Sequence, residues 1–157
     1  MKKFIVYVLF VFICAFSIFF YIKHDQSSEY EATTIPYIHQ VLPQISTWDP
    51  ELTKEYMAPE VLERVTPADI EKLMTSLSKL GQFQGIDEIE FKDKQSGEFI
   101  TRDQKPLVIY SLETRYSNGE AKVTIKLHEK GDSYEVFEFN FLSDLLAQEK
   151  AAKGAGE

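Results

Sequence analysis

Strict alternation of apolar and polar residues is the strongest pattern in this sequence. A period of two predicts a β-strand with one buried side and one side in water. Asn118 and Gly119 precede the alternating run, and this pair favours a tight type I′ hairpin turn. Residues 130–133 predict a second turn, so residues 106–142 are expected to form a three-stranded antiparallel meander. The alternating apolar positions are Ala121, Val123, Ile125 and Leu127, set against polar residues from Glu120 to His128.

The expected last strand of this meander contains one break in its alternation. Tyr134 and Val136 share one side of the strand, whereas Phe137, Phe139 and Phe141 share the other. An inserted residue restores a common buried side, because a β-bulge sets two residues of one strand opposite one residue of its partner. The sequence therefore predicts a bulge between Val136 and Phe137, and a sharply bent sheet.

A shorter apolar run before the meander also has strand character. Ile86, Ile89 and Phe91 predict a strand after Gly85, and residues 95–97 predict a turn. We expect a short partner strand over residues 98–102.

Helical spacing replaces the period of two in the first half of the chain. Thr66 is placed to cap a helix, Pro67 to occupy its first position, Asp69 to complete a capping box and Gly81 to end it. The predicted buried stripe of this helix is Ile70, Leu73, Met74, Leu77 and Leu80.

Two further helical segments are expected ahead of that helix. Thr34 with Pro36 predicts the start of a first helix, and Pro43 is expected to bend or split it. Asp49 followed by Pro50 predicts the cap and first position of a second, short helix, and residues 59–65 predict another short turn. The apolar face of the first helix is Ile35, Ile38, Val41, Ile45 and Trp48.

An apolar run from Phe4 to Ile22 follows the lysines at positions 2 and 3. A run of this length can cross the roughly 30 Å hydrocarbon core of a bilayer. A cleaved signal peptide is the alternative, because residues 15–17 loosely resemble a cleavage site. The basic residues before the run and the acids after it predict a cytoplasmic N-terminus and an exported domain. We expect an anchor over residues 1–23, a tether over 24–33, a domain over 34–143 and a flexible tail over 144–157.

Composition limits the partners of the expected domain. With 157 residues, 44% of them hydrophobic, the chain can form one ordinary core beside its N-terminal segment. From His24 onward lie 14 of the 17 basic residues and all 25 acidic residues, a net charge of −11, which disfavours nucleic acid as a partner. Cys14 is the single cysteine, so an intramolecular disulfide is excluded and stability must come from packing.

The order of helices followed by a bent antiparallel sheet predicts an α+β domain, with helices packed on a strongly bent sheet. It resembles the nuclear-transport-factor-2-like superfamily, a cystatin-like cone that includes ketosteroid-isomerase-like enzymes. The resemblance rests on residues 48–50, 73–81 and 134–139. It implies an open cone used as a ligand pocket, a catalytic chamber or a docking surface. The anchored domain also resembles the inner-membrane scaffold subunit of type IV secretion systems.

Catalysis of the ketosteroid-isomerase type requires a carboxylate base and an oxyanion donor in an apolar pocket. Tyrosines and His39 could act as donors, but no carboxylate can be assigned opposite them, so no catalytic residue is predicted. The histidines lack ligand spacing, so no metal or cofactor is expected. The acids Asp87, Glu88 and Glu90 predict a solvated strand face that protects a sheet edge.

We therefore expect a non-enzymatic domain on the inner membrane, anchored by a single pass and facing the periplasm or the outside of the cell. Its expected partner is another cell-envelope protein, with a second copy of the chain as a further candidate. Two alternatives stay open: a binding module for a small apolar ligand, and a hydrolase or isomerase with an unrecognised site. The residues expected to bind the partner or ligand are Tyr37, His39, Trp48 and Tyr56, because the first helices line the mouth of the suspected cone.

Overall fold

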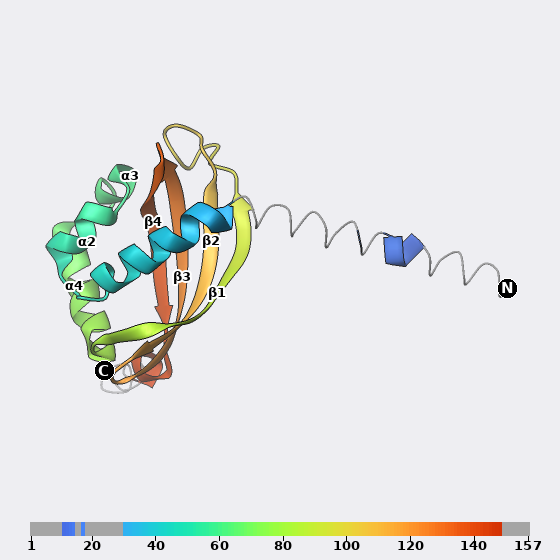
Figure 1. Ribbon diagram of the computed structural model, residues 1–157. Coiled ribbons are helices and arrows are strands. Elements are labelled where there is room, and N and C mark those ends of the chain that lie inside the picture. Colours follow the sequence, from blue (N-terminus) through green and yellow to red (C-terminus); the bar gives the residue numbers. More distant parts are fainter. Residues whose placement is uncertain (1–10, 15–16, 18–29, 149–157) are drawn as a thin grey trace. The chain divides into compact units, whose positions relative to one another are not determined.

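The structure is a computed structural model that describes residues 11–14, 17 and 30–148 (Figure 1). The chain divides into two compact units, residues 1–32 and residues 33–157. Within the described residues, no helix is both long enough and apolar enough to cross a bilayer. Most of the anchor expected over residues 1–23 and of the tether expected over residues 24–33 lies outside the described residues, so both stay predictions.

Helices form the first half of the domain. Residues 30–45 are helical, so Thr34 lies inside this helix rather than at its cap, and its side chain is fully buried. The helix also continues through Pro43 without splitting. The helices that follow are α2 (Pro50–Tyr56), α3 (Pro59–Leu62) and α4 (Pro67–Leu77), and a 3-10 turn, η1 (Ser78–Leu80), extends α4.

The predicted capping of α2 and α4 is confirmed. The Asp49 side chain accepts hydrogen bonds from the first amides of α2. Thr66 and Asp69 form the expected capping box at the start of α4, which satisfies amides that no helical carbonyl can reach. Gly81 follows η1 at φ 82°, a left-handed conformation that glycine adopts without strain. The predicted buried stripe of α4 differs at one position, because Leu73 remains 42% exposed.

Four antiparallel strands form one sheet in the order β1-β2-β3-β4. The three-stranded meander is confirmed, and β1 joins it at one edge. Residues 98–103 form turns instead of the expected partner strand, because β1 pairs along its length with β2. The strands are β1 (Phe83–Gln95), β2 (Leu107–Tyr116), β3 (Gly119–Lys130) and β4 (Ser133–Leu142).

The hairpin between β2 and β3 turns one residue earlier than predicted. Tyr116 pairs with Gly119, so Ser117 and Asn118 form the turn. Neither has a positive φ, which a type I′ turn requires at both central residues. The turn is held by tertiary hydrogen bonds, since the Ser117 amide donates to the Gln82 carbonyl at 2.8 Å and the Asn118 amide to the Leu80 carbonyl at 3.0 Å.

The predicted bulge in β4 is confirmed at Phe137. Lys126 pairs with Glu138 and Leu127 pairs with Val136, which leaves Phe137 as the extra residue. The bulge brings Tyr134, Val136 and Phe141 into the buried set despite their changed spacing.

Residues 33–45 of the first helix lie across one face of the sheet (Figure 1). The core includes the buried side chains of this segment and those of β2 and β3. On the β4 side, the Ala58 amide at the start of α3 donates to the Val136 carbonyl at 2.8 Å, and Met57 forms a single parallel bridge with Val136. The most deeply buried large side chains include Ile38, Leu42, Ile45, Tyr110, Leu112, Ile125 and Leu127.

Candidate functional site

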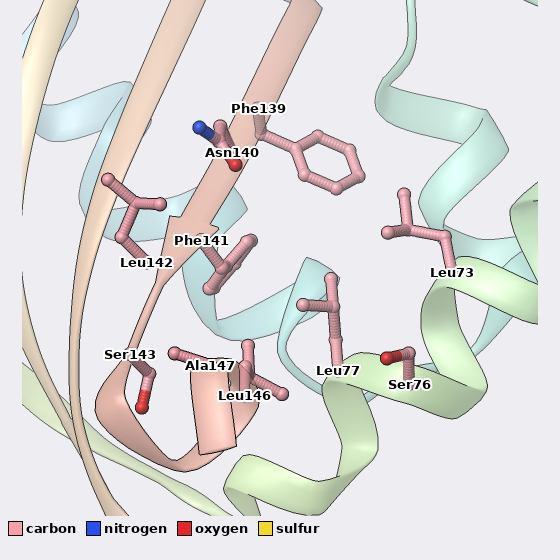
Figure 2. Close-up of a pocket in the computed structure, with 10 residues that line it drawn as sticks. All are labelled: Leu73, Ser76, Leu77, Phe139, Asn140, Phe141, Leu142, Ser143, Leu146 and Ala147. Carbon is pink, nitrogen blue, oxygen red and sulfur yellow. The ribbon is translucent and has the colours of Figure 1, made fainter. Parts of the chain in front are cut away.

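An apolar groove of about 290 Å³ lies between α4, the end of β4 and residues 143–147 (Figure 2). Phe139 and Phe141 point from β4 toward Leu73 and Leu77 of α4. Leu77 and Phe141 are buried, whereas Leu73 is 42% exposed and Leu142 is 58% exposed. The groove therefore has a packed floor and an accessible apolar rim.

Local sequence explains how these side chains come to face one another. Leu73 and Leu77 are four residues apart and lie on the same side of α4. Phe139 and Phe141 are two residues apart and share a side of β4 after the bulge. Residues 144–148 are helical, although the sequence analysis assigned them to a flexible tail, and Leu146 and Ala147 line the groove.

The polar groups in the groove lining are few and uncharged. They are the hydroxyls of Ser76 and Ser143 and the amide of Asn140. An uncharged apolar lining suits apolar side chains better than a charged substrate.

Trp48, a predicted binding residue, packs against one residue of the groove, Phe141. Its ring lies 5.8 Å from the ring of Phe141 and 5.5 Å from that of Tyr116, measured between centroids. The indole N–H donates to the Gly81 carbonyl oxygen at 2.8 Å. The polar tip of Trp48 is thus engaged within the fold, and its ring packs against Phe141 in the groove floor.

Tyr37 lies away from the groove, against β4. Its ring centroid is 5.7 Å from that of Tyr134. Burial raises the pKa of Tyr37 well above its usual range, and the charge of Glu135 and the nearby Tyr56 add to the effect. Tyr37 is therefore neutral at physiological pH and is poorly suited to act as a general base.

His39 and Tyr56 complete the predicted set. His39 is exposed on the helix over residues 30–45, and Tyr56 is half-buried at the end of α2. Neither is among the groove-lining residues. None of the four predicted residues lines the groove, and Trp48 packs against one lining residue, Phe141.

A second cluster, which the sequence analysis did not identify, surrounds His128. His128 Nε2 lies 2.8 Å from Asp103 Oδ1, and His128 Nδ1 lies 3.1 Å from Glu135 Oε1. His128 is buried even though strand alternation assigned it to the wet side of β3. Asp103, which precedes β2 in the chain, lies against His128. The alternation within β3 cannot predict a contact with a residue so far away in the sequence.

The carboxylates of this cluster accept other hydrogen bonds as well. Lys130 Nζ donates to Glu135 Oε2 at 3.0 Å, and the Lys105 amide donates to Asp103 Oδ1 at 3.1 Å. Although partial burial opposes it, the hydrogen bonds from His128 and the Lys105 amide hold the pKa of Asp103 below its usual value. The Arg102 amide donates to Glu60 Oε1 at 3.2 Å.

Asp87 and Glu90 of β1 form surface ion pairs. Arg115 Nε lies 2.7 Å from Asp87 Oδ2, and both side chains are about half exposed. Lys92 pairs with Glu90. Across residues 11–14, 17 and 30–148, no group of three or more histidine, cysteine or acidic side chains is arranged to hold a metal ion.

Comparison with protein-family models, with curated proteins and with solved structures finds no match to this chain.

Proposed function

We propose that this protein is a membrane-anchored, exported, non-enzymatic domain that binds another cell-envelope protein through the apolar groove. The proposal rests on the groove and its accessible rim. Leu73 and Leu142 are exposed beside a packed floor of Leu77 and Phe141. Burying one such leucine against a partner is worth about 1.5 to 3 kcal/mol, which is the scale of an interface hot spot.

The shape of the groove favours a docked side chain over an enclosed small ligand. Its volume of about 290 Å³ is at the lower limit for ligand pockets, and its rim is open. A deep, enclosed pocket would instead favour the alternative of a small apolar ligand.

The polar cluster supports the non-enzymatic part of the proposal. Both ring nitrogens of His128 contact carboxylates, so neither is free to accept a proton from a substrate. Asp103 and Glu135 are in turn engaged by other donors.

The proposed relationship to the nuclear-transport-factor-2-like superfamily draws on the bulge at Phe137 and on the helix lying across one sheet face. Both features are expected of a bent, cone-like domain. A docking role at the membrane is compatible with an accessory or scaffold position in a secretion system.

The anchor is tested by membrane topology. A reporter fused after Glu157 is expected to be active only outside the cytoplasm, because the basic N-terminus is retained inside. N-terminal sequencing of the purified protein should recover the segment through Ile22. A mature N-terminus near Ile18 would instead show a cleaved signal peptide and a domain without an anchor.

The groove is tested by site-specific photo-crosslinking in intact cells. A photoreactive residue at position 73 or 142 is expected to yield one dominant adduct with an envelope protein, identified by mass spectrometry. In the otherwise native chain, Leu73→Asp should weaken capture of that protein about 30-fold, because a charge is forced into an apolar contact. Capture is measured by titration of the identified partner against the purified full-length protein.

Thr75→Asp is the matched control, since Thr75 is exposed on α4 and is not a groove-lining residue. This variant should capture the partner like the native chain, and circular dichroism should show both variants folded. Equal capture by Leu73→Asp and the native chain would contradict the groove as the docking site. Extraction of an apolar small molecule in place of a protein adduct would favour the ligand-binding alternative.

A further inference from the structure

We propose that residues 96–106, here called the strap, are held against the sheet by hydrogen bonds that protonated His128 donates to Asp103 and Glu135. These hydrogen bonds are called the fastening, and the strap is released when His128 loses its second ring proton. The strap connects β1 to β2 and crosses the position where His128 of β3 pairs with Glu135 of β4. The inference is independent of the groove and of the proposed docking function.

The fastening joins a carboxylate from the strap, the imidazole and a carboxylate from β4. Asp103 belongs to the strap, and its side chain is 43% exposed. Glu135 is 10% exposed and belongs to a paired strand. The imidazole between them is 5% exposed.

Hydrogen-bonding capacity determines which protonation state fits. A neutral imidazole has one N–H, whereas the imidazolium ion has two. Both neighbouring carboxylates already accept hydrogen bonds from Lys130 and the Lys105 amide, as expected of ionised groups. Only protonated His128 can therefore donate to Asp103 and Glu135 together.

Loss of the proton leaves a ring lone pair facing a carboxylate oxygen. Glu135 is fixed by its strand and by Lys130, so Asp103 is the partner that can move into water. Two further contacts hold the strap here: the Arg102 amide donates to Glu60 Oε1, and the Arg102 side chain forms an exposed ion pair with Glu63. We expect deprotonation to separate Asp103 from the ring and to loosen the strap.

The sign of the pH dependence follows from the number of ring protons. The fastening needs an N–H on both ring nitrogens, so it is present when His128 is protonated and is lost when a rise in pH removes the second proton. The lowered pKa of Asp103 sets the acid limit, since protonation of Asp103 would also release the strap. The charged groups around the imidazole are Glu60 and Glu63 from α3 and its end, Arg102, Asp103 and Lys105 from the strap, Glu129 and Lys130 from β3, and Glu135 from β4.

Release would also change the apolar surface of the molecule. Phe99 is part of the strap, and its residue is 96% exposed. Its position relative to the sheet therefore depends on whether the strap is fastened.

Hydrogen–deuterium exchange of the full-length protein tests this proposal. Protection of peptides covering residues 96–106, corrected for the intrinsic base-catalysed rate, should fall about tenfold or more between about pH 6 and about pH 9. Peptides from β2 and β3 should keep their protection, which separates strap release from unfolding. Constant strap protection across this range would overturn the proposal.

Two isosteric variants make the test specific to the fastening. Asp103→Asn should remove the pH dependence, because an amide can accept from protonated His128 and donate to neutral His128. Glu63→Gln should keep it, since that variant loses the ion pair with Arg102 on the exposed side of the strap. A native pH profile in Asp103→Asn would show that another group controls the strap.

Discussion

Trp48→Ala is expected to destabilise the domain by about 3 kcal/mol, even though Trp48 was predicted from the sequence as a binding residue. The variant removes the ring that packs on Tyr116 and Phe141. It also leaves the Gly81 carbonyl without the indole donor. Chemical denaturation monitored by far-ultraviolet circular dichroism measures the loss, since this variant lacks the only tryptophan of the chain.

Trp48→Phe separates packing from hydrogen bonding. It keeps an aromatic ring and loses the N–H donor, so a loss of about 1 kcal/mol is expected. A native-like free energy of unfolding for Trp48→Ala would show that the ring is dispensable for the fold. Trp48 does not line the groove, so Trp48→Ala should weaken partner capture only indirectly, by allowing Phe141 to move. Leu73→Asp changes a groove residue directly and is therefore the more specific test of docking.

Gly97→Ala is expected to cost about 2 to 3 kcal/mol. An added Cβ would lie 1.7 Å from the Lys105 carbonyl oxygen and 2.6 Å from Thr101 Oγ1. The clash is with backbone, so the turn at the end of β1 must shift and the bond from Thr101 Oγ1 to the Lys105 carbonyl oxygen is strained. Urea unfolding of the variant and the native chain at one pH measures the difference.

Gly119→Ala adds the same atom in open space and serves as the matched comparison. No atom lies within 4 Å of its added Cβ, and the remaining cost is the backbone strain at φ 154°, about 1 kcal/mol. Hairpin chemistry alone would rank Gly119 as the more sensitive position. A larger loss for Gly119→Ala than for Gly97→Ala would contradict the close packing of Gly97 against Lys105 within the strap.

The capping of α4 and the bulge of β4 were predictable because their signals are local. Thr66 and Asp69 satisfy each other's amides within one turn, whatever the rest of the chain does. The bulge follows from a change of side between Val136 and Phe137 that only an extra residue can correct.

The groove was predictable only in part. Sequence periodicity identified Leu73 and Phe141 as apolar positions, but it assigned Leu73 to the buried stripe. Leu73 stays exposed because nothing in the described chain covers the space between α4 and the end of β4. Whether an apolar residue is exposed depends on where the neighbouring helices and strands end, and tertiary packing determines this.

The sequence by itself determined the α+β class, the caps of α2 and α4, the meander and its bulge, because each depends on residues within one turn or one strand. Tertiary structure decided the rest. Ser117 and Asn118 form the hairpin turn because the backbone of residues 80–82 supplies hydrogen-bond acceptors there. His128 is buried in a position that alternation assigns to water, because Asp103, 25 residues earlier in the chain, is brought against it. Contacts across such distances depend on the geometry of the whole domain, and local periodicity has no access to them.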